Sequence, residues 1–164
     1  MKTYVITLSK TFGVKHPKCG MPTDFRELYE EGIKIHTIRA NFPYWKGRFD
    51  NIAENEGFLS LRQWSEKPYY SKQEPIRDLY ASDGIGLQEL VFVDGDIMKP
   101  CIVQDPDLFN PERQLIPIAV DELAANDGLS VQDWLDWFKV YDLTEPMAII
   151  HFTRFRYNEH ETNS

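Results

Sequence analysis

The sequence contains only two cysteines, Cys19 and Cys101, among 164 residues. They match neither a disulfide framework nor the paired spacing of zinc sites, so a reducing, cytoplasmic environment is expected. Long apolar runs are also missing, and the opening MKTYVITLSK has only a short apolar stretch broken by hydroxyl residues. That stretch is too short for a signal peptide or a membrane span. We expect it to form the first strand, and we expect no membrane partner.

Positive charge is scarce in the second half of the chain. Residues 1–80 hold 13 Lys and Arg against 10 Asp and Glu, whereas residues 81–164 hold 5 against 16. The net charge of −8 argues against an extended nucleic-acid duplex as partner, because such binding depends on cations that neutralise phosphates. A local basic pocket in the first half remains compatible with a nucleotide or an RNA end.

The sequence also lacks the common signatures of catalytic and metal sites. It has no Gly-rich phosphate loop, no Ser-His-Asp order and no paired-carboxylate motif. His16 and Cys19 stand three residues apart, but a zinc site needs three or four ligands, and only the distant His36 or Cys101 could complete it. We therefore expect neither a metal nor another cofactor.

The order of the predicted elements favours an α+β fold. There are no internal repeats or low-complexity linkers, which favours a single domain over residues 1–164. Alternation of apolar residues predicts strands at 58–64 and 72–80, and the apolar segment 146–155 should be the terminal strand. Because the elements do not follow a βαβ rhythm, we predict a mixed or antiparallel barrel-like sheet of about six or seven strands with about three helices.

Turn and cap residues place the remaining elements. Asp94-Gly95 predicts a hairpin, followed by an irregular segment over 106–117. Asp24 can cap a short helix that ends near Gly32. A helix over 119–127 and another that begins after Ser130 complete the prediction.

Cationic and aromatic residues gather just after the first predicted helix, within residues 30–51. A hydroxyl three residues after a lysine can meet it at a turn, as Thr37 follows Lys34. A Lys34 enclosed by isoleucines would have a lowered pKa and could act as a base, with Thr37 as the nucleophile. The alternative is a capping threonine beside surface cations. Nearby, Trp45 offers either a stacking surface or ordinary core.

A second cluster spans residues 62–73 and interleaves cations with aromatic rings. Such a combination suits a nucleobase site, because rings stack on bases and cations hold phosphates. The alternative is a hairpin whose aromatic side chains pack across the strands. The candidate ligand-binding residues in this cluster are Arg62, Trp64, Tyr69 and Lys72.

The segment EGIKIHTIRA resembles the G-x-K-x-x-T-x-R signature of ASCH domains, which have the PUA-like fold. Gly32, Lys34, Thr37 and Arg39 stand at the positions of that signature. Further similarity lies in GFLSLRQW, LAANDGLSVQDWLDWF and MAIIHFTRF, so the resemblance covers nearly the whole chain in element order. It implies a β-barrel-like fold with a cleft lined by the Lys–Thr–Arg segment.

Many ASCH domains are regarded as RNA-binding modules, and a bacterial branch hydrolyses the amide of acetylcytidine with a Lys, a Thr and a Glu. The resemblance carries these catalytic roles to Lys34, Thr37 and Asp127, with Arg39 steadying an oxyanion or holding the ligand. Three features depart from that branch. Asp127 is one methylene shorter than the glutamate, the loop after the motif is longer and lacks a Gly-Asp pair, and residues 80–118 form an insert.

Three hypotheses about function follow from the sequence. The first is a cleft that binds a nucleobase-like ligand, a nucleotide or an RNA end. The second is an amidohydrolase that removes an acyl group from a modified nucleobase such as acetylcytidine. The third is a protein-interaction module that makes contacts through the acidic second half and has no catalytic role. The intact motif favours the first, while the aspartate and the insert weigh against the second.

Overall fold

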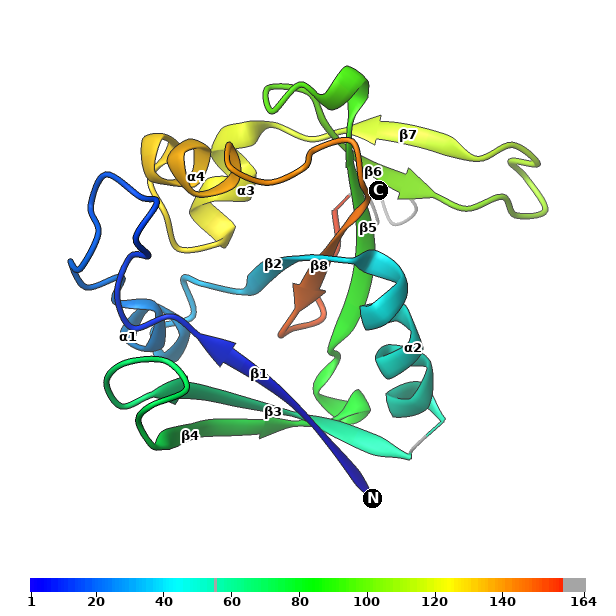
Figure 1. Ribbon diagram of the computed structural model, residues 1–164. Coiled ribbons are helices and arrows are strands. Elements are labelled where there is room, and N and C mark those ends of the chain that lie inside the picture. Colours follow the sequence, from blue (N-terminus) through cyan, green and yellow to red (C-terminus); the bar gives the residue numbers. More distant parts are fainter. Residues whose placement is uncertain (55, 158–164) are drawn as a thin grey trace.

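The computed structural model describes residues 1–54 and 56–157. Over that part of the chain, eight strands, four α-helices and two short 3-10 helices follow one another (Figure 1). Their order and bounds are β1 (Lys2–Leu8), α1 (Phe25–Glu30), β2 (His36–Ala40), α2 (Phe42–Ala53), β3 (Gly57–Trp64), β4 (Gln73–Leu79), η1 (Ala81–Asp83), β5 (Gly86–Phe92), η2 (Val93–Gly95), β6 (Pro100–Gln104), β7 (Gln114–Pro117), α3 (Val120–Asn126), α4 (Val131–Phe138) and β8 (Met147–His151).

The strands form two sheets. One has three strands in the order β1-β3-β4, with β1 parallel to β3, and the other has five in the order β2-β8-β5-β6-β7, all antiparallel. The predicted α+β class is therefore confirmed, with more strands and helices than predicted. Among the described residues no ladder joins the two sheets into a closed barrel. The segment 80–118 supplies three strands of the larger sheet, β5, β6 and β7.

Strand β8 separates two hydrophobic cores. All five of its residues are buried, and they alternate between the cores. Ala148 and Ile150 pack with the three-stranded sheet and α2, while Met147 and Ile149 pack with α3 and α4. A strand buried on both faces reads as a continuous apolar run, which explains why the segment MAIIHF shows no alternation in the sequence. Its neighbour β2 is thereby held between the two cores.

Three local predictions were wrong. Residues 42–53, expected to belong to the long loop after the motif, are helix α2, whose buried face carries Trp45, Phe49 and Ile52 at helical spacing. Gln114–Pro117, expected to be irregular, forms strand β7 against β6. Asp24 does not cap α1 through its side chain, because its backbone lies in the left-handed region with φ 61°. Tertiary contacts overrode the local sequence signals in these segments.

Pro75 stands where a strand tolerates proline, because it lies on the edge strand β4, opposite Arg62, where the register with β3 shifts. The predicted hairpin is confirmed. The turn between β5 and β6 contains Asp94 and Gly95, which both have positive φ.

The predicted N-cap of α4 is also confirmed, because the Ser130 side chain accepts a hydrogen bond of 3.1 Å from the Asp133 amide. Replacing Ser130 by Ala should lower the free energy of unfolding by about 1 kcal/mol, since one amide of the first turn loses its acceptor. Urea unfolding measures this cost. The control is Ser65→Ala, whose hydroxyl caps no helix and whose loss should change stability by less than about 0.5 kcal/mol.

Candidate functional site

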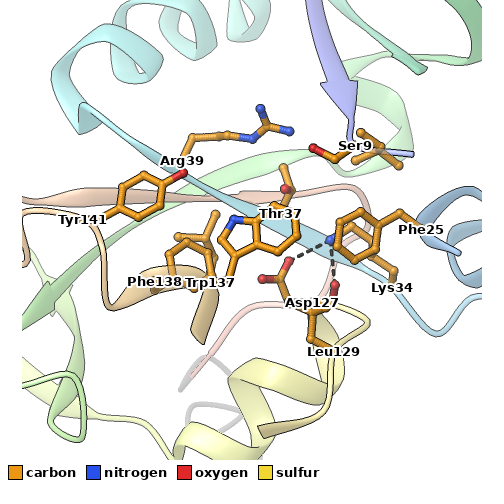
Figure 2. A pocket seen from close by; sticks show the side chains of 12 residues that line it. Ser9, Phe25, Lys34, Thr37, Arg39, Asp127, Leu129, Trp137, Phe138 and Tyr141 are labelled. Atoms are coloured by element: carbon orange, nitrogen blue, oxygen red, sulfur yellow. Dashed lines mark hydrogen bonds and ion pairs between the residues drawn. The ribbon is translucent and has the colours of Figure 1, made fainter. Parts of the chain in front are cut away.

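A small cavity lies between the end of β1, strand β2 and the helices α1, α3 and α4 (Figure 2). Its volume is about 110 Å³. The residues that line it are Leu8, Ser9, Phe25, Lys34, Thr37, Ile38, Arg39, Asp127, Leu129, Trp137, Phe138 and Tyr141. The four residues of the predicted Lys–Thr–Arg–Asp group thus meet at one place, although 93 positions separate Lys34 from Asp127.

Lys34 is a buried cation at the base of this cavity. Only 1% of its surface is exposed. Its Nζ donates hydrogen bonds of 2.7 Å to both the backbone carbonyl oxygen and Oδ1 of Asp127, and it lies 4.1 Å from the centre of the Phe25 ring. Figure 2 shows the ammonium between these two groups. The alternative reading of the motif as surface cations therefore does not apply to Lys34.

The backbone around Asp127 explains why an Asp-Gly pair stands there. Asp127 ends helix α3, and Gly128 follows with φ 79°, a left-handed conformation that favours glycine. A Cβ at Gly128 would lie 3.2 Å from the Cβ of Lys34, closer than ordinary packing allows. The turn thus aims the Asp127 carboxylate at Lys34 and leaves room for the lysine side chain.

The two charges shift each other's pKa against the effect of burial. Burial disfavours the ammonium and lowers the pKa of Lys34, and the Asp127 carboxylate opposes this shift without cancelling it. Burial alone would raise the pKa of Asp127, but Lys34 and His36 outweigh it and hold that pKa below its usual range. With no ligand bound, we expect a carboxylate at Asp127, so that the lysine acts as a hydrogen-bond donor.

Thr37 and Arg39 lie two residues apart on β2, so their side chains share one face of the strand. Thr37 is 6% exposed. Arg39 is partly buried and donates through Nη2 to the carbonyl oxygen of Thr7, and no described carboxylate lies within ion-pair distance of it. Burial lowers the pKa of Arg39, and Tyr141 and Tyr69 are among the groups that oppose this shift. Its guanidinium therefore retains donors for a ligand.

A buried polar network of His36, Tyr157 and Asn126 lies beside Asp127. His36 is fully buried, with Nδ1 3.8 Å from Asp127 Oδ1 and Nε2 2.6 Å from the hydroxyl oxygen of Tyr157. That oxygen also accepts a 3.0 Å hydrogen bond from Asn126 Nδ2. If the Tyr157 hydroxyl donates to Nε2, the proton of His36 sits on Nδ1 and faces the Asp127 carboxylate. Sequence reasoning treated His36 only as a remote metal ligand.

The other candidate ligand-binding residues do not line this cavity. Trp45 packs in the core on the buried face of α2. Arg62 donates to Ser60 and to Gln73, and Lys72 is exposed on the β3–β4 connection. The ring of Trp64, at the end of β3, lies 5.3 Å from that of Tyr69 in the connection to β4. Tyr69 is 86% exposed and has φ 68°, which is uncommon for a bulky residue.

Eight lining residues were missed as site residues, namely Leu8, Ser9, Phe25, Ile38, Leu129, Trp137, Phe138 and Tyr141. Trp137 and Phe25 lie on helix faces whose pattern indicates ordinary core. Ser9 and Tyr141 lie outside the helices and strands, where periodicity gives no signal. Only the tertiary fold brings them to the cavity.

A second polar cluster joins the loop after β1 to helix α4. Ligand atoms of His16, Asp133 and Asp136 lie within 4.8 Å of one another. However, His16 Nδ1 accepts from the Lys18 amide at 3.0 Å, so its Nε2 carries the proton and donates to the Asp133 carbonyl oxygen at 3.1 Å. Lys18 and Lys139 pair with the two carboxylates at 2.8 Å. The cluster therefore serves as a structural latch with no imidazole nitrogen available to a metal.

Comparison with family models, with curated proteins and with solved structures finds no match to this chain. None of the helices formed by residues 1–54 and 56–157 is long and apolar enough to cross a membrane. The resemblance to ASCH domains therefore stays a hypothesis that depends on the motif residues.

Proposed function

We propose that this chain binds a nucleobase-like ligand in the Lys34 cavity. The observation that carries the proposal is the convergence of Lys34, Thr37, Arg39 and Asp127 on one enclosed space. Two cations, a hydroxyl and a carboxylate offer both donors and acceptors, which is what the edge of a base requires. The edge of a free nucleoside or of an unpaired RNA end could enter such a space, whereas a paired base could not.

The volume favours the edge of a single ring. An apolar protein cavity of about 150 Å³ holds benzene, and the Lys34 cavity of about 110 Å³ is somewhat smaller. A pyrimidine edge or a small acyl group would fill it, while a sugar would remain at the mouth. The excess of one positive charge over the carboxylate suits a ligand that presents a carbonyl oxygen.

We also propose that the domain is related to the ASCH family and that its two sheets correspond to an open PUA-like barrel. The proposal is supported by the placement of the motif residues around one cavity, with Gly32 at the end of α1 and Thr37 and Arg39 on β2. The insert at 80–118 would then extend the barrel with the strands β5, β6 and β7.

Hydrolysis of an acylated nucleobase is the second candidate, favoured by the position of Thr37 beside a lysine with a lowered pKa. In that reaction the Thr37 oxygen attacks the acyl carbon while its proton passes to neutral Lys34, and Arg39 stabilises the oxyanion. The amine then leaves with that proton, and water releases the acyl group from Thr37. The two hydrogen bonds from Lys34 to Asp127 oppose this route, because they favour the charged lysine.

A thermal-shift screen with cytidine, N4-acetylcytidine, other nucleosides, nucleotides and short RNAs tests the proposal. A ligand at 100 times its Kd stabilises by about 2.7 kcal/mol, which should raise the Tm by several degrees. A shift without product supports the binding cleft, and a shift with release of acetate supports the hydrolase. The absence of any shift would count against both and leave the protein-interaction hypothesis.

Replacing Arg39 by Gln should weaken the binding of the ligand found in that screen by about tenfold to a hundredfold, because a charge-assisted hydrogen bond is lost. Isothermal titration measures the change. The matched control is Arg113→Gln, since Arg113 pairs with Glu89 away from the cavity and should leave affinity unchanged. Equal affinity in the wild type and in Arg39→Gln would remove Arg39 from the site.

A further inference from the structure

A second pocket adjoins the Lys34 cavity and shares a wall with it. This groove has a volume of about 250 Å³, and Ser9, Trp137 and Tyr141 line both spaces. Its other lining residues are Gly13, Val14, Lys15, His16, Asp136 and Val140. A molecule with its head in the cavity could therefore extend directly into the groove past Trp137 and Tyr141.

Apolar side chains stand exposed around this groove. Val14 is 87% exposed, Val140 46% and Tyr141 40%. They surround one depression beside a polar cavity, so they form a coherent apolar surface that scattered exposed residues would not form. The charged groups Lys15 and Asp136 have opposite signs, so the groove attracts neither an anion nor a cation in particular.

The loop that presents Val14 is held in place. Its two arms are joined by the Thr11–Pro22 bridge, by a hydrogen bond from the Phe12 amide to the Met21 carbonyl oxygen, and by one from the Gly20 amide to the Phe12 carbonyl oxygen. The latch then fixes the loop to α4, because Lys18 Nζ lies 2.8 Å from Asp133 Oδ2.

Ring contacts connect His16 of this polar cluster, through Phe12, to Trp137 in the wall of the groove. The Phe12 ring lies 4.4 Å from the His16 ring and 5.7 Å from that of Trp137. The loop thus forms a fixed wall, and an exposed apolar residue at its tip is preorganised for contact with a ligand.

We propose that the ligand has two parts and that this groove holds an apolar, ring-sized group attached to the polar head in the Lys34 cavity. The inference rests on the proposed function for its head group and adds the chemical class of the attached group. The groove of about 250 Å³ is larger than the roughly 150 Å³ that accommodates a benzene ring. Together the two spaces reach the lower end of the range of about 300–1,000 Å³ typical of ligand sites.

The test compares N4-acetylcytidine, N4-benzoylcytidine and benzyl alcohol by NMR on protein labelled at its Leu and Val methyl groups. Leu129 reports on the cavity, and Val14 and Val140 report on the groove. The benzoyl compound should bind about tenfold more tightly than the acetyl compound, because its ring removes apolar surface from water. It should also shift the methyl signals of Val14 and Val140.

Two variants separate the groove from general effects. Val140→Ser should abolish the preference for benzoyl and leave the affinity for the acetyl compound unchanged. The matched control is Val131→Ser, since Val131 is similarly exposed at 40% but lines none of the pockets described here. The control should retain the tenfold preference.

The outcomes distinguish the two proposals. If acetylcytidine shifts Leu129 but the benzoyl compound binds no better and leaves Val14 and Val140 unmoved, the groove inference is wrong and the proposed function stands. If neither nucleoside shifts Leu129, the proposed function fails and benzyl alcohol decides the groove. In that case, shifts at Val14 that benzyl alcohol causes in the wild type and not in Val140→Ser support an apolar ligand site in the groove. The absence of such shifts overturns the inference.

Discussion

Replacing Lys34 by Met should lower the free energy of unfolding by about 3–5 kcal/mol, because it leaves the Asp127 carboxylate buried without its counter-ion. Lys34 and Asp127 are 1% and 3% exposed, so contact with bulk water compensates little for the lost partner. The methionine nearly matches the aliphatic part of the lysine, so packing contributes little to the loss. Urea unfolding at pH 7 measures the cost.

A double-mutant cycle isolates the pair. Asp127→Asn removes the opposite charge, and Lys34→Met combined with Asp127→Asn removes both. Because a buried pair can be replaced at little net cost, the double variant should be more stable than the sum of the single costs predicts, by at least about 1 kcal/mol. Strictly additive costs would mean that the two side chains do not interact in solution. The double variant also provides a folded protein in which the cavity lacks its charges.

Acidification should destabilise the protein strongly between about pH 6.5 and pH 4.5. Burial lowers the pKa of His151 to about 2, and burial also lowers the pKa of His36. The His151 imidazole stays neutral when folded and gains a proton on unfolding, and the lowered pKa of His36 acts in the same direction. The unfolded state therefore binds more protons below the ordinary imidazole pKa of about 6.5. Stability is therefore complete above that pH and is lost as the pH falls.

The expected size follows from linkage. A group that is neutral only in the folded state lowers the free energy of unfolding by about 1.4 kcal/mol for each pH unit below its unfolded pKa. His151 alone therefore lowers the free energy of unfolding by about 2.7 kcal/mol between pH 6.5 and pH 4.5. His36 acts in the same direction. The measurement is urea unfolding at pH values from 7.5 to 4.5. His151→Gln should reduce the slope of the free energy of unfolding against pH by the equivalent of one proton. A constant midpoint across this range would contradict the neutral, buried state of both histidines.

The sequence predicted the components of the site better than its surroundings. Lys34, Thr37 and Arg39 lie within six residues of a short motif, and the resemblance to ASCH domains added Asp127, so these four positions could be named from the sequence. Trp45 was ambiguous because an aromatic residue has the same local signal in a binding site and in a core. Its helical spacing with Phe49 and Ile52 identifies the core face.

The remaining parts depended on long-range contacts. Strand β7 exists because it pairs with β6, and its sequence has no alternation that would predict it. The latch joins Lys18 to Asp133 across 115 positions, and the His36–Tyr157 contact spans 121. No local pattern encodes such contacts, so the support behind Asp127 and the groove beside the cavity could be found only in the folded chain.

The most direct test of a ligand site at Lys34 is a titration of wild-type protein labelled at its Ile and Leu methyl groups with N4-acetylcytidine, followed at Leu129 and Ile38. Both residues line the cavity and lie in no other pocket described here. We predict shifts that saturate in the wild type and are absent in the Lys34→Met, Asp127→Asn double variant. Signals that stay fixed in the wild type, or that move equally in both proteins, would contradict the proposal that this cavity binds a nucleobase-like ligand through its charged residues.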